Sequence, residues 1–227
     1  MPRYRAALRR GVAAAVEHED FDLAMSTRTV VDVGANRGQF AVFALERLPQ
    51  ATIHCFEPGP AASSALRRLL GAFHDGARVH IYEVALGRCA EPRVLHRTAD
   101  DDASSLHTAA HRQRERGTRE VERVNVTTRR LDDVLPPSEL VRPVLLKVDV
   151  QGSELAVLEG AGELLDAIDE VIVECSFAEF YVGQDAAADI VALLRARKFT
   201  LDALRPSITE RGLVLQADLL FRRVVPS

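Results

Sequence analysis

Five short runs of apolar residues recur along the chain, and each is apolar throughout instead of alternating with polar residues. A run of this kind indicates a strand that is buried on both faces, as strands are in parallel sheets. The runs occupy residues 29–34, 52–57, 78–86, 143–150 and 170–176.

Helical patterns separate these runs. Apolar residues repeat at intervals of three and four, which gives each helix one apolar stripe to lay on a sheet. Strand and helix alternate, so the sequence predicts a doubly wound, mostly parallel α/β sheet. Near the C-terminus, FTLDAL and ADLLFRRVV indicate two further strands, and we expect the second, antiparallel, at the sheet edge. The helical patterns lie within residues 40–48, 62–69, 155–165 and 187–194.

Residues 91–130 interrupt the alternation. They contain two β-rich stretches, residues 92–98 and 120–128, and the polar stretch between them is too long for a hairpin turn. A loop of that length in a compact domain is usually functional or disordered, so we expect a β-rich insertion that carries a lid. Without an internal repeat or a linker, residues 1–227 are expected to form one domain, with a helical N-terminal segment at residues 1–27.

Composition excludes several classes of protein. The net charge is −4 and basic residues are scattered among acidic ones, which disfavours a nucleic-acid partner. No stretch approaches the roughly 18 apolar residues of a membrane span, and the N-terminus lacks a signal-peptide core. The cysteines Cys55, Cys89 and Cys175 are odd in number, without metal-type spacing, and are interpreted as packing thiols. The sequence therefore predicts a soluble, cytoplasmic protein.

A glycine turn follows the first predicted strand, in the sequence VVDVGANRGQF at residues 30–40. Gly34 lets the backbone turn close to a ligand, and Gly38 permits close packing where the next helix begins. A dinucleotide site would have three glycines as G-x-G-x-x-G, but Ala35 and Asn36 replace the middle glycine. Asp32 is poorly placed for a pyrophosphate and suits a ligand that has an ammonium and a sulfonium group. S-adenosylmethionine carries both.

An acid also ends the second predicted strand, in the sequence CFEPGP. Glu57 lies 25 positions after Asp32, and an acid at that place can accept both ribose hydroxyls of an adenosine ligand. Pro58 then ends the strand. NAD sites share this acid, so only the sequence of the glycine turn distinguishes S-adenosylmethionine from NAD. Taken alone, the turn is also typical of a plain βα connection, and Glu57 is typical of a solvated strand end. Their common register within one βαβ unit favours a binding site for an adenosine ligand.

These sequences resemble the FkbM-type family of S-adenosylmethionine-dependent methyltransferases. VVDVGANRGQF resembles the first family motif, CFEPGP the second, TTRRLDDVL the Leu-Asp-Asp segment and LLKVDVQGSELAVLEGA the most distinctive block, and the similarity continues through VIVECS and QADLLF. The family usually has Glu where Gln151 stands. The resemblance implies a Rossmann-like class I methyltransferase fold and O-methylation of a small hydroxylated acceptor, commonly a sugar or a polyketide-derived group. The residues expected to bind the donor are Asp32, Gly34, Ala35, Asn36, Gly38, Gln39, Glu57 and Pro58.

Two acids follow the fourth and fifth predicted strands. Asp149 and Glu174 should both lie at the carboxyl ends of neighbouring strands, where an open α/β sheet binds its ligand. One of them can deprotonate the acceptor hydroxyl as a general base. Alternatively, the pair can hold a divalent cation, for which carboxylate oxygens favour Mg²⁺ or Mn²⁺ over Zn²⁺. Asp149 could also cap the following helix, and Lys147 is expected to form a structural ion pair with an acid.

The insertion offers further polar groups. His107 titrates near neutrality and is a candidate acceptor-side base, while Ser104 and Ser105 could hydrogen-bond the acceptor or the donor. The stretch HRQRERGTR indicates a solvated lid or, alternatively, a site for an anionic acceptor.

Two other functions stay open at this point. An NAD(P)-dependent oxidoreductase shares the strand–turn–helix and Glu57, although the middle glycine and a Tyr-x-x-x-Lys pair are missing. The second alternative is a catalytically silent module that binds an adenosine ligand and a partner protein. Pairing of the chain as a homodimer is also expected.

Overall fold

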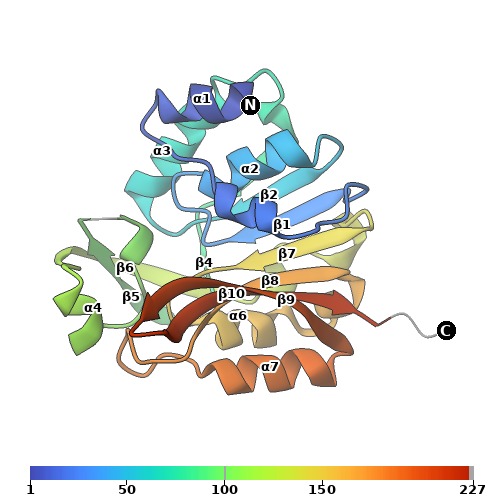
Figure 1. Cartoon of the computed structure of the whole chain (residues 1–227). Coiled ribbons are helices and arrows are strands. Elements are labelled where there is room, and N and C mark those ends of the chain that lie inside the picture. The colour runs from blue at the N-terminus through green and yellow to red at the C-terminus, as the bar shows by residue number, and fades with distance from the viewer. Residues whose placement is uncertain (100, 225–227) are drawn as a thin grey trace.

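The structure, a computed structural model, describes residues 1–99 and 101–224, and they form a seven-stranded sheet with helices on both faces (Figure 1). The strand order is β3-β2-β1-β7-β8-β10-β9, and β10 runs antiparallel to both of its neighbours. The expected doubly wound sheet with an antiparallel C-terminal strand is confirmed. Its strands are β1 Thr29–Val33, β2 Thr52–Phe56, β3 Val79–Tyr82, β7 Val144–Val148, β8 Glu170–Ser176, β9 Phe199–Glu210 and β10 Leu213–Arg223.

Two helical layers cover this sheet. Helices α1, α2 and α3 lie on one face, and α6 and α7 lie on the other (Figure 1). The helices are α1 Pro2–Leu8, α2 Gln39–Arg47, α3 Pro60–Leu70, α4 His111–Glu115, α5 Leu131–Val134, α6 Glu154–Ala161 and α7 Ala187–Ala196. Short 3₁₀ helices are η1 Val16–Asp20, η2 Gly76–Arg78, η3 Asp101–Ala103, η4 Pro137–Glu139 and η5 Gly162–Ala167.

The central strands β1 and β7 are buried along their whole length because each contributes side chains to both layers. Val30 packs into the cluster that contains Phe43 of α2, whereas its neighbour Val31 packs into the cluster that contains Leu158 of α6. Alternate side chains point to opposite faces of a strand, so burial of both faces requires an uninterrupted apolar run. This is the pattern from which the strands were predicted.

Two sequence-based expectations about the sheet were wrong. The run at residues 78–86 divides into β3, at the sheet edge and only half-buried, and β4 Ala85–Leu86, which pairs with the insertion. The edge on the other side is β9, and β10 lies between β8 and β9. An edge strand has only one neighbour to pair with. Whether a strand lies at the edge therefore depends on which other strands pair with it and not on its own composition.

The insertion and β4 together form a three-stranded sheet in the order β4-β6-β5. Strands β5 Pro92–Thr98 and β6 Glu120–Arg129 pair antiparallel, which confirms the expected strand pair. The polar stretch between them returns to the main body, where the backbone N–H of Ala110 donates to the carbonyl of Phe180 at 2.8 Å. Asp100 lies outside the described residues.

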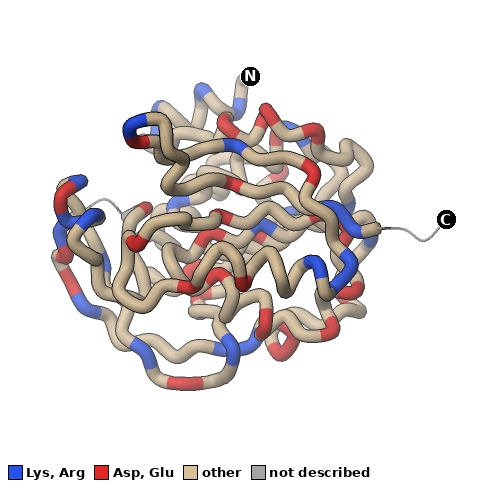
Figure 2. The backbone as a smooth tube through the Cα atoms, turned by 60° about the horizontal axis from the view of Figure 1, so that its bottom comes forward, with Lys and Arg blue, Asp and Glu red and all other residues tan. Residues whose placement is uncertain are grey.

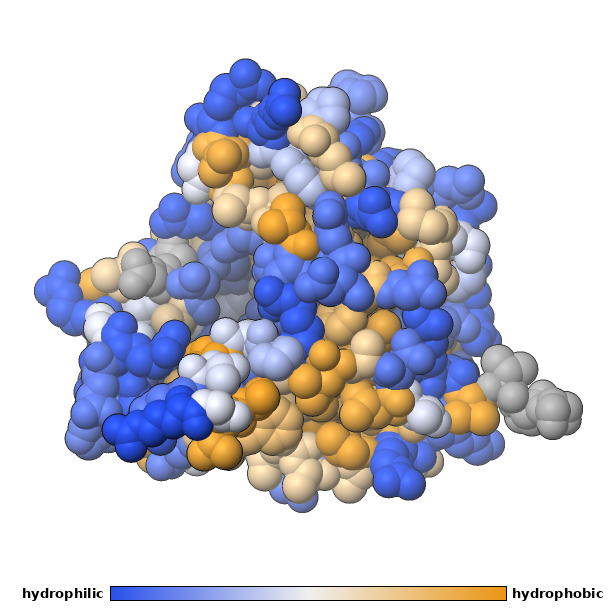
Figure 3. All heavy atoms as spheres, in the orientation of Figure 1, coloured by the Kyte–Doolittle hydropathy of each residue, from blue (hydrophilic) through white to orange (hydrophobic). Residues whose placement is uncertain are grey.

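The surface carries both signs of charge. Lys and Arg are interspersed with Asp and Glu along the chain (Figure 2). None of the helices in residues 1–99 and 101–224 has the length and hydropathy of a membrane span. Apolar side chains gather over the region of β9 and α7 (Figure 3), where Leu201 and Leu204 are exposed. Cys55 and Cys175 are buried as expected, but Cys89 is exposed and is therefore not a packing thiol.

Candidate active site

A cavity of about 430 Å³ opens at the carboxyl ends of β1, β2, β7 and β8. This volume lies within the range of small-molecule sites. The turns after β1, β2 and β7 form its floor with Gly34, Glu57 and Asp149, and Glu174 near the end of β8 completes it. The N-terminal segment and the insertion supply its walls, so the cavity lies where an open α/β sheet binds ligands.

The turn after β1 is shaped by two glycines. Gly34 has a φ of +82°, and a Cβ atom there would lie 1.8 Å from the carbonyl oxygen of Asp149. No other residue fits at this contact between the ends of β1 and β7. Gly38 has a φ of +98°, and a Cβ atom there would lie 2.5 Å from Cδ1 of Leu66 in α3. Gly38 thus allows close packing where α2 begins, as expected from the sequence.

Of the residues expected to bind the donor, six line the cavity and two do not. Asp32 and Gly38 lie behind the turn and contribute no surface to the cavity. The residues that line it are Gly34, Ala35, Asn36, Gln39, Glu57 and Pro58.

Glu57 is held in place by the backbone of two turns. Its Oε2 accepts the N–H of Asn36 at 2.9 Å, and its Oε1 accepts the N–H of Gly59 at 2.7 Å. Burial raises the pKa of Glu57 to about 7, although these two hydrogen bonds favour the charged form. The carboxylate is therefore preorganised at the end of β2, with lone pairs left for hydroxyl donors in the cavity.

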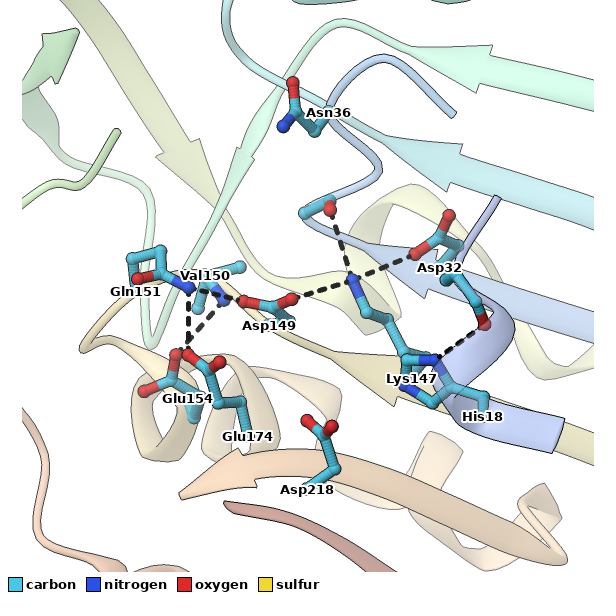
Figure 4. A network of polar contacts seen from close by, with 12 residues as sticks. His18, Asp32, Asn36, Lys147, Asp149, Val150, Gln151, Glu154, Glu174 and Asp218 are labelled. Atoms are coloured by element: carbon cyan, nitrogen blue, oxygen red, sulfur yellow. Dashed lines mark hydrogen bonds and ion pairs between the residues drawn. The ribbon is translucent and has the colours of Figure 1, made fainter. Parts of the chain in front are cut away.

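Lys147 joins the floor of the cavity to the core. Its Nζ lies 3.4 Å from Oδ1 of Asp32 and 3.4 Å from Oδ2 of Asp149, and it donates to the carbonyl of Gly34 at 3.2 Å (Figure 4). Although burial acts to lower it, the pKa of Lys147 is raised by the charges of Asp149 and Asp32. The expected ion pair between Lys147 and an acid is confirmed.

Direct contact between Asp32 and a donor was expected and stays a prediction, but Asp32 does not line the cavity. Asp32 is fully buried and faces Lys147 across the parallel pair of β1 and β7. Its carboxylate pairs with the Lys147 ammonium group, and its negative charge adds to the effect of burial that raises the pKa of Glu57.

Gln151 connects the two expected catalytic acids. Its Nε2 donates to Oδ1 of Asp149 at 2.8 Å and to Oε2 of Glu174 at 2.9 Å (Figure 4). The hydroxyl of Tyr181 lies 2.9 Å from the Gln151 Oε1, which fixes the orientation of the amide. Burial, together with the charges of Asp149 and Glu154, raises the pKa of Glu174 well above its usual range. Asp149 and Glu174 thus form one hydrogen-bonded group.

The same arrangement does not fit a divalent cation between Asp149 and Glu174. The amide nitrogen of Gln151 occupies the place between the carboxylates, and the Lys147 ammonium group approaches Asp149 from the other side. Within the described part of the chain, no three His, Cys, Asp or Glu side chains gather in a way that could hold a metal ion. The donor set therefore gives no support to the expected Mg²⁺ or Mn²⁺.

His107 does not lie where an acceptor-side base is needed. It is absent from the cavity lining, and both of its ring nitrogens have partners, with Nδ1 3.2 Å from the carbonyl of Val182 and Nε2 2.9 Å from Oγ of Ser153. Burial lowers its pKa. The geometry therefore gives no support to a catalytic His107, which stays a prediction, and the ring connects the insertion to the loops after β7 and β8. Its neighbours Ser104 and Ser105 do line the cavity.

Two functional residues were not predicted from the sequence, one in the cavity wall and one that holds a cavity residue in place. His18 of η1 lines the cavity from the N-terminal segment, and Tyr181 orients Gln151 from the loop after β8. Neither stands in a motif, so no local pattern marked them.

Comparisons with known proteins agree with this geometry. A family model described as the methyltransferase FkbM domain matches residues 32–201. The chain is 31% identical to the 2-O-methyltransferase NoeI of Sinorhizobium fredii, over 85% of this chain and 78% of that protein. It is also 31% identical to the 31-O-demethyl-FK506 methyltransferase FkbM of Streptomyces tacrolimicus, over 77% and 73%.

Solved structures show the same fold at low sequence identity. The precorrin-6y C5,15-methyltransferase of Geobacter metallireducens aligns with a TM-score of 0.51 and 12% identity over 92% of this chain and 87% of that one. The magnesium protoporphyrin IX methyltransferase of Synechocystis, solved with bound S-adenosylmethionine, aligns with a TM-score of 0.50 and 12% identity over 98% and 79%. The chain therefore belongs to the FkbM methyltransferase family, and the S-adenosylmethionine-dependent O-methyltransferase expected from its sequence is confirmed at that level.

Proposed function

We propose that this enzyme methylates a hydroxyl group of a sugar, a glycoside or a saccharide-containing natural product. The cavity carries the proposal, because it has an adenosine-type acid, Glu57, at one end and the group of Asp149, Gln151 and Glu174 at the other. Many hydrogen-bonding side chains around one cavity suit a small acceptor that is rich in hydroxyls. The relatives named for 2-O and 31-O methylation support transfer to oxygen.

The donor end would be built from the turns after β1 and β2. Glu57 is proposed to accept the two ribose hydroxyls of the donor in a bidentate contact. Asn36, whose N–H already orients Glu57 at 2.9 Å, shares that end with Pro58. Gly34, Ala35 and Gln39 would lie along the remainder of the donor.

The acceptor end supplies a base. S-adenosylmethionine, when bound, supplies an electrophilic methyl group on its sulfonium. Holding the acceptor oxygen in line with that methyl group can lower the barrier by about 7–11 kcal/mol in favourable cases. Asp149 is proposed to take the hydroxyl proton, because it lines the cavity at the carboxyl end of β7 and its carboxylate lies 3.4 Å from the Lys147 ammonium group. Gln151 would hold the Asp149 carboxylate in the orientation this requires.

Glu174 is proposed to assist without carrying the charge. Burial, together with the charges of Asp149 and Glu154, raises its pKa well above the usual range, which favours the protonated side chain, and Gln216 Nε2 donates to its Oε2 at 2.8 Å. A neutral carboxylic acid next to Asp149 can hydrogen-bond a neighbouring hydroxyl of the acceptor. Addition of EDTA should leave the rate unchanged, and restoration of a lost rate by Mg²⁺ would contradict this base mechanism.

Two measurements test the proposed function. Calorimetric titration with S-adenosylhomocysteine should give heat well below about 1 mM ligand, whereas binding of NADH in its place would favour the oxidoreductase. Labelled S-adenosylmethionine should then transfer its methyl group to a member of a panel of methyl glycosides and macrolide glycosides. Binding without transfer to any acceptor, including extracts of the native cell, would favour the silent module.

Pairing of two chains is proposed through the exposed face of β9. Leu201 and Leu204 are about half exposed on this edge strand, and an edge strand offers unpaired backbone groups to a second copy. Light scattering should give twice the monomer mass, and Leu204→Lys should return the monomer. A monomer at all concentrations would refute the pairing.

A further inference from the structure

The N-terminal segment forms one wall of the cavity, and His18 of η1 lies in that wall (Figure 4). Only 5% of His18 is exposed, and its ring packs edge-on against Phe40 with centroids 5.0 Å apart. This segment precedes residue 32, at which the match to the family model begins. The family model therefore does not include this part of the cavity wall.

The contacts of His18 define what its free nitrogen can do. Nδ1 lies 3.3 Å from the carbonyl of Ala15, and because a carbonyl only accepts, Nδ1 carries the proton. Burial, together with the positive charge of Lys147, lowers the pKa of His18 to about 4. The ring is therefore neutral at physiological pH, and Nε2 has a lone pair available. Within residues 1–99 and 101–224, this buried Nε2 has no hydrogen-bond partner.

A second buried acceptor lies in the same cavity. Gln39, at the start of α2, has an Oε1 that is also buried without a hydrogen-bond partner among the described residues. Glu17, adjacent to His18, lines the cavity as well. The Oδ1 of Asn36, which also lines the cavity, is a third such acceptor among the described residues. Buried polar atoms in folded proteins are nearly always paired, so orphaned acceptors gathered at one cavity indicate a ligand that donates hydrogen bonds. Because the Glu17 carboxylate lies in the same wall, the hydrogen-bond donor that fits best is a cation with several N–H groups.

We propose that His18, Gln39 and Glu17 bind the α-ammonium group of the donor's methionine part. The proposal rests on the proposed function, because it assumes that the donor lies with its ribose at Glu57. That placement leaves the amino-acid end of the donor for the wall on the β1 side, where α2 begins. An ammonium group has three N–H bonds, which suits one imidazole nitrogen, one amide oxygen and one carboxylate.

The experiment compares two ligands that share the thioadenosine part and differ in the amino-acid part, which includes the proposed contact. S-adenosylhomocysteine has the amino-acid end, and 5′-methylthioadenosine lacks it. In His18→Phe, which keeps a ring but removes the acceptor, S-adenosylhomocysteine should bind about tenfold more weakly, while 5′-methylthioadenosine should bind as it does to the wild type. His18→Gln, which retains an acceptor oxygen, should recover part of the loss.

His54→Phe is the matched control, because His54 is equally buried, at 4% exposure, and lies outside the cavity. It should leave both affinities unchanged, and thermal unfolding should show that all variants are folded. Equal weakening of both ligands in His18→Phe, or no change in either, would overturn the proposal. If the wild type binds neither ligand, the proposed function fails and this inference falls with it.

Discussion

Replacement of Lys147 by methionine removes the only ammonium group that contacts Asp32 in the described residues, and we expect the free energy of unfolding to fall by about 3–5 kcal/mol. Each carboxylate contact at 3.4 Å has a Coulomb energy of about 5 kcal/mol at an effective dielectric constant of about 20. Desolvation of Lys147 offsets much of that sum. The remainder is large because Asp32 is fully buried and water cannot replace its partner.

The loss should depend on pH. Burial raises the pKa of Asp32, and the positive charge of Lys147 opposes that increase. Without Lys147, the folded-state pKa of Asp32 rises further above its unfolded value. A group whose folded pKa is raised contributes stability below its unfolded pKa and loses it as pH rises through the folded pKa. The deficit of Lys147→Met should therefore be smallest near about pH 4 and grow toward neutrality.

Urea unfolding at several pH values measures this. Adding Asp32→Asn to Lys147→Met should restore part of the stability, since no buried charge is then left without a partner. The other lysine, Lys198, is exposed, and Lys198→Met should change the free energy by no more than about 0.5 kcal/mol. A Lys147→Met protein within about 1 kcal/mol of the wild type at pH 7, or no recovery with Asp32→Asn, would refute the reasoning.

Three further predictions concern the cavity. Asp149→Asn should lower kcat by about 10²–10⁴-fold while calorimetry shows unchanged S-adenosylhomocysteine affinity, and an unchanged kcat would remove Asp149 as the base. Binding of S-adenosylhomocysteine should tighten as pH rises from about 6 to 8, because Glu57, with a pKa of about 7, must lose its proton to accept both hydroxyls. In Glu57→Gln the affinity should be weaker and nearly independent of pH. A pH dependence that persists in this variant would show that another group causes it. Gly34→Ala should abolish binding of S-adenosylhomocysteine, because the new Cβ would lie 1.8 Å from a backbone oxygen. Gly117 has a similar φ of +92° and open space around it, so Gly117→Ala should cost about 1–2 kcal/mol of stability and keep activity. Equal activity in both variants would contradict the steric argument.

The parts of the fold that local pattern determines were predicted well. The strands β1 and β7 were found because burial on both faces requires continuous apolar residues. The division of residues 78–86 into β3 and β4 was not found, because it depends on the pairing of Ala85 with Thr128 of the distant strand β6. Pairing over such a distance leaves no trace in the composition of either segment.

The candidate site divides in the same way. Gly34 and Glu57 could be placed from their positions at strand ends, which parallel strands bring to one edge of the sheet. Whether an acid faces the cavity or the core was not predictable, because Asp32 and Asp149 both stand near strand ends and only the packing distinguishes them. His18 could not be predicted either, since its partners are Ala15 nearby and aromatic rings in α2.

The position of β10 inside the sheet constrains the order in which the molecule can assemble. Strand β9 is made first, but its place in the sheet exists only once β10 has paired with β8. While the ribosome is still making residues 213–223, the first five strands of the sheet can already align, and β9 has nothing to join. The last two strands must therefore dock as a preformed hairpin, or β10 must dock first and recruit β9 afterwards.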